Sequence, residues 1–291
     1  MARFSFDRGF IIPALITPYK SDGSINLVAL EQLVDALISE GVKGFYVSGS
    51  TGEAFLQTVE ERKAIASTVA QKAKGKAHVI FHVGSIATHQ AVELAKFAQD
   101  IDIDEISSLS PFYYKFSKEE IANYYEAILD SCSKPLIIYN IPVLTGISMT
   151  NTCPHLFEHP NVSGIKHTTS DFYEFRNLKT KYPHLTLFSG FDEMGLAGLS
   201  MGSDGMIGST FNYQAKLFFD LVEAYKSGDT LKALSLQDKA NKTISTILST
   251  GLYNSIRYLI TKKYGIDVGE SRKPFAPLTK ESKAILDQLP I

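Results

Sequence analysis

The sequence predicts an α/β fold, a closed (β/α)8 barrel of the TIM type with a C-terminal helical extension. Three observations predict it. Short apolar runs alternate with amphipathic segments, eight such pairs fit within roughly 225 residues, and the loops that join them are short and evenly spaced. The strand signals stop after about residue 227. We therefore expect a barrel domain over residues 1–227 and a helical appendage over residues 228–291 that packs on the barrel.

The composition is that of a globular protein with little net charge. Of the 291 residues, 44% are hydrophobic, which is enough to bury a large core. The 29 Lys and Arg residues nearly balance the 31 Asp and Glu residues, so no overall field favours nucleic acid or a membrane surface, and small molecules are the expected partners. Charges within residues 1–10 argue against a secretory signal, and two cysteines suit a reducing compartment. We expect a cytoplasmic protein.

The predicted strands are short and mostly apolar. The first spans residues 11–17 and contains Pro13, which predicts an irregular start or a bulge because proline cannot donate a ladder hydrogen bond. The others are predicted at 44–48, 78–83, 105–110, 135–139, 162–169, 185–188 and 205–208.

The predicted helices follow from caps and from apolar spacing. Asn26 can cap the first helix, and capping boxes at Thr58 and Ser117 open two more, the latter ending near residue 131. Further helices are expected at 87–99, 150–158, 171–181, 192–201 and 214–226. The extension is expected to form helices from Asp229, at 250–264 and at 279–289, with a loop at 269–277.

An open doubly wound sheet would show the same alternation of strands and helices. The count of eight strand–helix pairs and their even spacing favour a closed barrel over an open sheet. No Gly-x-Gly-x-x-Gly follows the first strand, and the glycine-flanked segment 49–52 lacks the P-loop lysine, so neither dinucleotide nor Walker-type binding has support.

Lys166 lies within an otherwise apolar strand. Burial disfavours the ammonium form and leaves more free amine to act as a nucleophile. The alternative is a structural lysine paired with a carboxylate, since perturbed titratable groups are enriched at functional sites but not confined to them.

Polar side chains follow several of the predicted strands, and in a closed parallel barrel the carboxyl ends of the strands form the active-site rim. Hydroxyls, phenols, an amine and carboxylates should therefore converge on one face of the barrel. They are Ser50, Thr51, Tyr113, Tyr114, Tyr139, Lys166, Thr168, Asp192, Glu193, Ser209 and Thr210.

This set suits Schiff-base chemistry on a 2-keto acid. The amine of Lys166 would condense with the ketone, Ser50 and Thr51 would hold the carboxylate, and the phenol of Tyr139 would move a proton. Structural alternatives remain open at this point. Tyr139 can be a core aromatic, Ser50 and Thr51 can cap a turn, and Asp192 and Glu193 can favour the first turn of a helix.

One segment matches a pattern that binds metal in other proteins. His155 and His159 belong to an H-x-x-E-H pattern, but Pro154 and Pro160 confine it to little more than one turn, and the pattern needs a helix. We expect no metal and no organic cofactor.

Seven segments together resemble the N-acetylneuraminate lyase family, within the pyruvate-dependent aldolases related to dihydrodipicolinate synthase. The resemblance spans nearly the whole chain, and the ordered set is specific although each segment alone is weak. The segments are GSTGE (49–53), SPFYYKFS (110–117), YNIP (139–142), GIKHT (164–168), GFDE (190–193), IGST (207–210) and RKPF (272–275).

The resemblance implies a role for each matching residue. Lys166 is the Schiff-base lysine, Tyr139 transfers the proton, and Ser50 and Thr51 hold the carboxylate of pyruvate. Tyr113 reaches toward the site of a neighbouring subunit, where it forms a hydroxyl relay with Ser50 and Tyr139, and a homotetramer is expected. The positions that match the sugar-tail site are Thr168, Gly190, Asp192, Glu193 and Ser209.

The resemblance also implies the reaction, reversible cleavage of N-acetylneuraminate (a sialic acid) to N-acetylmannosamine and pyruvate. Alternatives are a dihydrodipicolinate synthase-like enzyme, a keto-deoxy sugar acid aldolase, or a barrel that only binds a keto acid. Dihydrodipicolinate synthases carry an arginine shortly after the Asn-x-Pro segment, whereas residues 143–145 are uncharged here. Two departures from the lyase pattern, His167 and residues 107–110, bear on substrate preference.

Overall fold

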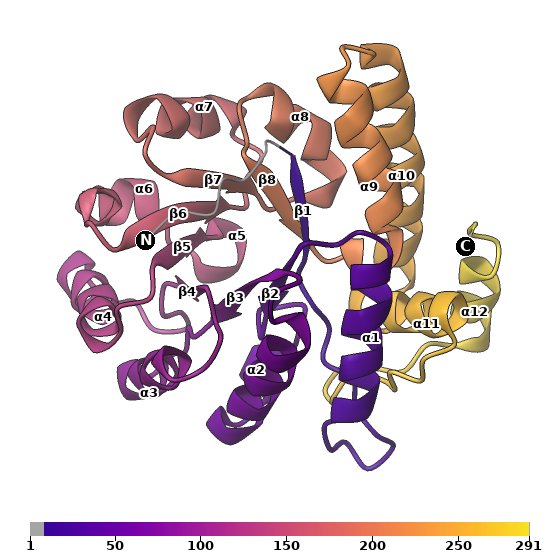
Figure 1. Cartoon of the computed structure of the whole chain (residues 1–291), viewed down its shortest axis with the longest axis horizontal. Helices are drawn as coiled ribbons and strands as arrows, with labels where there is room; N and C mark the ends of the chain where they lie inside the picture. Colours follow the sequence, from indigo (N-terminus) through magenta and orange to yellow (C-terminus); the bar gives the residue numbers. More distant parts are fainter. Residues whose placement is uncertain (1–8, 291) are drawn as a thin grey trace.

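The computed structural model describes residues 9–290 and shows eight parallel strands in one sheet, ringed by helices (Figure 1). The strand order β1-β8-β7-β6-β5-β4-β3-β2 places each strand beside its neighbour in sequence, as in a TIM barrel. The strands are β1 (Phe10–Pro13), β2 (Gly44–Val47), β3 (His78–His82), β4 (Glu105–Leu109), β5 (Leu136–Asn140), β6 (Val162–His167), β7 (Thr186–Ser189) and β8 (Gly205–Gly208).

The helices cover the outside of the sheet. The caps expected at Asn26, Thr58 and Ser117 are present, the last two as complete capping boxes. The helices of the barrel are α1 (Leu27–Ser39), η1 (Ala54–Leu56), α2 (Val59–Ala73), α3 (Thr88–Gln99), α4 (Lys118–Ser131), α5 (Pro142–Thr145), α6 (Met149–Thr152), η2 (Pro154–Glu158), α7 (Phe172–Lys181), η3 (Asp192–Met194), α8 (Gly195–Ser200) and α9 (Phe211–Lys226).

The barrel closes between β1 and β2 through a single bridge. Ala14 pairs with Tyr46, and the Leu15 amide donates to the Tyr46 carbonyl at 2.9 Å. Along a strand, successive backbone amides point alternately to the two neighbouring strands. The Ala14 amide donates to Gly208 on β8, so the nitrogen of Pro13 points toward β2. Proline has no amide hydrogen, so it cannot donate a hydrogen bond there. The expected bulge at Pro13 is wrong, because its register with β8 is regular. The effect of Pro13 is seen instead in the pairing of β1 with β2, which is limited to the bridge between Ala14 and Tyr46.

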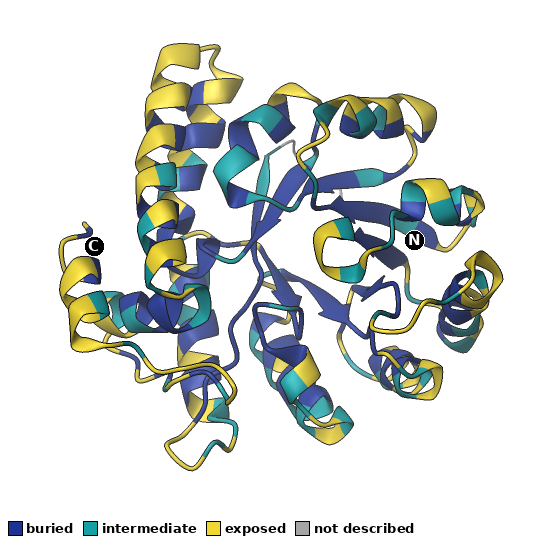
Figure 2. Cartoon of the chain, turned by 180° about the vertical axis from the view of Figure 1, so that it is seen from behind, coloured by how far each residue is buried: buried dark blue, intermediate teal, exposed yellow. Residues whose placement is uncertain are grey.

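Side chains alternate between the inside of the barrel and the layer beneath the helices, as the two-residue period of a strand requires. Figure 2 shows the strands as an almost wholly buried centre with exposed outer helix faces. A larger cluster fills the space between sheet and helices, and a smaller one fills the barrel itself. The smaller cluster contains Ile12, Ala14, Tyr46, Ile80, Leu109, Ile137, Tyr139, Ile141, Phe188 and Ile207.

Three C-terminal helices follow the barrel: α10 (Thr230–Thr250), α11 (Leu252–Tyr264) and α12 (Lys280–Leu286). α10 runs beside α9, and α11 and α12 pack beneath it (Figure 1). The helical extension is confirmed, and the division into domains at residue 227 stays a prediction. No helix within residues 9–290 has the length and apolar character to cross a membrane. The N-terminal segment judged to lack a secretory signal lies almost wholly outside the described residues.

Several predicted boundaries are wrong for local reasons. The strand expected at 11–17 ends at Pro13. The helix expected at 150–158 is two pieces, α6 and the 3-10 helix η2, because Pro154 cannot continue the first. The helix expected at 192–201 is likewise η3 followed by α8, and α9 starts three residues earlier than expected, with Gln214 outside helical geometry.

Candidate functional site

Lys166 projects into the barrel from β6. Its neighbours on the strand, Ile165 and His167, point outward, so the lysine shares the inner face with Thr168. The Lys166 Nζ lies 4.0 Å from the centre of the Tyr139 ring and 4.6 Å from that of Tyr46. Burial lowers the pKa of Lys166 to about 7, although the carboxylate of Asp192 acts in the opposite direction. A substantial fraction of free amine is therefore present at neutral pH.

Tyr139 stands next to the lysine on β5, paired in register with Lys166. Its ring packs edge-on against Tyr46, with centroids 6.0 Å apart. Burial raises the pKa of Tyr139 to about 12, and the nearby hydroxyls of Thr168 and Ser50 oppose this in part. The phenol thus stays protonated near neutrality, so it can move a proton by accepting one while donating its own.

Asp192 is buried at the end of β7 and faces β8. One carboxylate oxygen, Oδ2, accepts from the Thr210 amide at 2.7 Å and from the Thr210 hydroxyl at 2.6 Å. The other, Oδ1, lies where a side chain at position 208 would be: a Cβ on Gly208 would stand 1.7 Å from it. Burial raises the pKa of Asp192 to about 6, despite the two bonds from Thr210 and the positive charge of Lys166.

The turn after β2 carries Ser50 and Thr51. The Thr51 hydroxyl lies 2.7 Å from that of Ser209 after β8, so the two predicted binding hydroxyls meet directly. The backbone of this turn is unusual, since Ser48 and Glu53 both have positive φ angles, 55° and 60°. Ser50 remains partly accessible and borders the opening described below.

Thr168 and Gly190 form a close contact at the ends of β6 and β7. A Cβ at position 190 would lie 1.8 Å from the Thr168 Oγ1, so only glycine leaves room for that hydroxyl. The Oγ1 is buried and makes no hydrogen bond of standard geometry within residues 9–290, although it lies close enough to the Tyr139 phenol to lower the pKa of that phenol. Glu193 is half-buried nearby, where its carbonyl accepts from Asn241.

Tyr113 is not brought to this cluster within the chain. Its side chain is 83% exposed, its φ angle is +81°, and its ring contacts Tyr114 with centroids 4.9 Å apart. The structure therefore unites Lys166, Tyr139 and the hydroxyls at the rim, and leaves Tyr113 on the surface.

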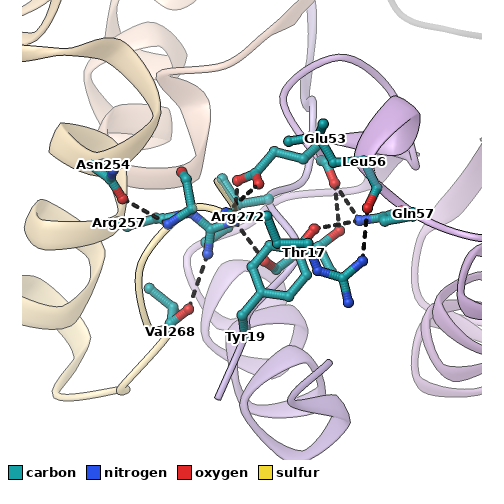
Figure 3. A network of polar contacts seen from close by, with 12 residues as sticks. Thr17, Tyr19, Glu53, Leu56, Gln57, Asn254, Arg257, Val268 and Arg272 are labelled. Carbon is teal, nitrogen blue, oxygen red and sulfur yellow. Dashed lines mark hydrogen bonds and ion pairs between the residues drawn. The ribbon is translucent and has the colours of Figure 1, made fainter. Parts of the chain in front are cut away.

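A buried charged network around Glu53 supports the turn after β2, and it was not predicted from the sequence (Figure 3). Arg257 of α11 is almost fully buried and forms an ion pair with Glu53 at 2.6 Å. The second oxygen of Glu53 accepts from the Arg272 amide at 2.9 Å. Arg257 also donates to the carbonyl of Thr17. The C-terminal extension thus holds the loop that follows β2, through a contact between residues 204 positions apart.

His82 is a second group that was not predicted. Its Nδ1 lies 3.0 Å from the Ser48 carbonyl, and its Nε2 lies 3.3 Å from the Leu109 amide, which can only donate. The proton therefore sits on Nδ1. Burial lowers the pKa of His82 well below its usual value, so the ring is neutral and stabilises the strained turn at Ser48.

An apolar opening of about 330 Å³ adjoins the polar cluster at Ser50. Its walls come from η1, the β4 and β5 loops and the C-terminal extension. The lining residues are Ser50, Glu53, Phe55, Leu56, Leu109, Phe112, Leu144, Thr145, Tyr253, Pro274 and Phe275. Within residues 9–290 no group of three or more His, Cys, Asp or Glu residues is arranged to hold a metal ion.

A closed barrel with a desolvated amine beside a phenol at the carboxyl ends of its strands defines a class of proteins suited to Schiff-base chemistry on a carbonyl compound. The particular family follows from comparison with known proteins. The chain belongs to the dihydrodipicolinate synthetase family, whose model matches residues 7–289.

The relatives cover nearly the whole chain. A curated N-acetylneuraminate lyase from Citrobacter koseri is 38% identical over 285 residues, 96% of each chain. A Clostridium difficile protein solved in complex with mannosamine is 37% identical, with a TM-score of 0.92 over 97% of both chains. A dihydrodipicolinate synthase from Bacillus anthracis has the same TM-score at 26% identity, covering 98% of this chain and 100% of its own.

Proposed function

We propose that this protein is a class I aldolase that reversibly cleaves N-acetylneuraminate to N-acetylmannosamine and pyruvate. The observation that carries the proposal is the desolvated amine of Lys166, 4.0 Å from the ring of Tyr139. Its relatives at 37–38% identity are named N-acetylneuraminate lyases, and they match over 96% of the chain. No metal or organic cofactor is required by this chemistry, because the iminium ion itself accepts the electrons.

The reaction begins when the Lys166 amine adds to the C2 ketone of the open-chain sugar acid and water leaves. In the resulting iminium ion, the C3–C4 bond breaks and its electron pair moves into the nitrogen-linked system to form an enamine. The C4 hydroxyl becomes an aldehyde and gives its proton to the Tyr139 oxygen, while the phenol passes its own proton to a neighbouring acceptor. Protonation of the enamine at C3 and hydrolysis then release pyruvate and restore the amine.

The remaining site residues would bind the two ends of the substrate. Ser50 and Thr51 would donate to the carboxylate of the keto acid. The hydroxyls of the sugar tail would meet groups at the ends of β6, β7 and β8. These groups are Thr168, Gly190, Asp192, Glu193 and Ser209.

A dihydrodipicolinate synthase-like activity is the second candidate, favoured by the close structural match to the Bacillus anthracis enzyme. The aldehyde of that reaction carries a second carboxylate. The residues of α5 that line the opening beside Ser50 are Leu144 and Thr145, and neither brings a positive charge to bind it. Asp192 and Glu193 would repel it. A neutral polyol tail fits these surroundings better.

We further propose that the protein is a cytoplasmic homotetramer. The exposed aromatic pair Tyr113 and Tyr114 supports a subunit contact, because large apolar side chains gathered on a surface mark interaction sites. Light scattering coupled to size exclusion should give a mass about four times that of the chain. A monomeric mass would contradict the tetramer and the proposed place of Tyr113 at a neighbouring site, but it would not bear on imine formation by Lys166.

The function is tested by measuring pyruvate release from N-acetylneuraminate by the wild type and by Lys166→Ala. The wild type should turn the substrate over, and the variant should lose nearly all activity. Parallel assays with aspartate semialdehyde plus pyruvate, and with keto-deoxy sugar acids, address the alternatives. Negligible release from N-acetylneuraminate with efficient use of another substrate would refute the choice of substrate.

A further inference from the structure

On the outer side of β6, opposite the reacting amine, lies a buried polar cluster that the proposed reaction does not use. His167 is fully buried there, between Lys166 and Thr168 in the chain. Its ring packs edge-on against Phe175 with centroids 5.7 Å apart. Since it faces away from the barrel interior, it would not contact a substrate bound there, and its bearing on substrate preference stays a prediction.

The hydrogen bond between Asn140 and His167 determines which ring nitrogen carries the proton. Asn140 Oδ1 accepts from the Met149 amide at 2.9 Å, so its NH2 group is the part that faces His167 Nδ1, at 3.0 Å. An amide NH2 can only donate, so Nδ1 must be an unprotonated acceptor. The proton then sits on Nε2, which lies 3.3 Å from Oε2 of Glu174, a close polar contact without the geometry of a standard hydrogen bond.

The cluster therefore joins three elements. Glu174 belongs to α7, His167 ends β6, and Asn140 ends β5 and holds the start of α6 through Met149. The pKa of Glu174 lies below its usual value, chiefly because of its contact with His167. The other oxygen of Glu174 accepts from the Thr150 hydroxyl.

The two strands that this cluster ties together are those that carry the reacting pair. Asn140 follows Tyr139 directly, and His167 follows Lys166 directly. In a strand the side chain of one residue points to the face opposite that of the next, so a bond between Asn140 and His167 outside the barrel sets the separation of Tyr139 and Lys166 inside it. The backbone is also paired at this end, where the Thr168 amide donates to the Asn140 carbonyl at 2.9 Å, and the side-chain bond adds a second link between the same two strand ends.

We propose that His167 is a positioning residue for the reaction, and that its bond to Asn140 holds the Tyr139 phenol in line with the amine of Lys166. The inference rests on the proposed aldolase function. The step that depends on alignment is proton transfer between the C4 hydroxyl and Tyr139. Misplacement of reacting groups by about 1 Å costs on the order of a hundredfold in rate.

Three variants separate the bond of His167 to Asn140 from its contact with Glu174. In His167→Asn the side-chain oxygen, bonded to Cγ as Nδ1 is, can still accept from Asn140. In His167→Gln the amide nitrogen reaches the position of Nε2 and can still donate to Glu174, but the acceptor for Asn140 is lost. His167→Phe keeps a ring at this position and loses both the bond to Asn140 and the polar contact with Glu174.

We expect kcat for pyruvate release from N-acetylneuraminate to fall by about tenfold to a hundredfold in the Gln and Phe variants, and KM to change much less. The Asn variant should keep a kcat close to that of the wild type, because it retains the acceptor for Asn140. The rate at which borohydride traps pyruvate on Lys166, and its pH dependence, should stay at wild-type values in all folded variants, because the amine itself is untouched. Thermal unfolding shows whether each variant is folded. If the Phe variant does not fold, the comparison of the Asn and Gln variants tests the proposal.

A kcat equal to that of the wild type in all three variants would overturn the proposal. A near-normal kcat in the Gln variant with a low kcat in the Asn variant would also overturn it, because the contact with Glu174 would then be the important one. Equal loss in Asn and Gln would also overturn it. If the wild type itself neither releases pyruvate nor forms the adduct, the proposed function has failed. If the wild type releases pyruvate and forms the adduct, and the variants have the same kcat, only the role of His167 is refuted and the proposed function stands.

Discussion

Burial controls the charge of the two central titratable residues. The pKa of Lys166 falls to about 7 because the ammonium is desolvated, and that of Asp192 rises to about 6 because the carboxylate is desolvated. Each charge stabilises the other, so the negative carboxylate keeps the pKa of the amine from falling further. The free amine predominates above about pH 7, and protonation below it removes the nucleophile.

This balance predicts a pH profile. The rate of adduct formation with pyruvate should decline on the acid side with a midpoint near the pKa of Lys166, about 7. Asp192→Asn removes the negative charge that raises this pKa, so the midpoint should move to lower pH. Borohydride trapping at a series of pH values measures both profiles. A midpoint that moves to higher pH, or that does not move, would show that Asp192 does not act on the amine through its charge.

At the scale of elements, the site depends on how loops are held from outside the barrel. The turn with Ser50 and Thr51 rests on Glu53, which is buried against Arg257 of α11. Removing one partner of a buried ion pair leaves an uncompensated charge, whereas an exposed pair contributes little. The C-terminal extension is thus part of the support of the site.

Glu53→Ala should lower the free energy of unfolding by roughly 3–5 kcal/mol, because Arg257 is left buried without its carboxylate. KM for pyruvate should rise as well, since the Ser50 turn loses its support. The matched control is Glu60→Ala, whose carboxylate is 78% exposed in its pair with Lys63 and should matter little. Denaturant unfolding measures the stabilities. Equal small effects of the two substitutions would contradict a structural role for the Glu53 pair.

The sequence predicts the regular elements well and their supports poorly. Caps such as Thr58 and apolar spacing are local signals, and all eight strands lie close to where they were expected. The residues that resemble a known family also predicted that Lys166 and Tyr139 would be neighbours. The Glu53–Arg257 pair could not be predicted, because a contact across 204 positions leaves no local pattern. Nothing in the sequence marks His167 as facing outward except its place beside Lys166 in the strand.

At the scale of the whole molecule, the proposed tetramer would add a residue of a neighbouring subunit to the rim of the barrel. Tyr113 lies on the surface, 83% exposed and held at a positive φ angle that costs energy for a residue other than glycine. The proposed tetramer would place it at the site of a neighbouring subunit, with its hydroxyl near Ser50 and Tyr139. A surface residue of one chain would then belong to the reaction of another.

Tyr113→Phe tests this arrangement because it removes only a hydroxyl. The substitution should lower kcat by roughly tenfold or more, as expected for loss of a group in a proton-transfer path, and should leave the melting temperature unchanged. The control is Tyr173→Phe on α7, which is 80% exposed and should have no effect. Activity of Tyr113→Phe equal to that of the control would remove the hydroxyl from the mechanism.

The central claim is that Lys166 forms a covalent imine with a keto acid, and trapping tests it most directly. The protein is incubated with pyruvate, reduced with borohydride, digested and examined by mass spectrometry, with Lys166→Ala treated in parallel. Reduction should attach pyruvate to the peptide that contains Lys166 and abolish activity, and the variant should remain unmodified. An unmodified Lys166, or an adduct on another lysine, would contradict the assignment.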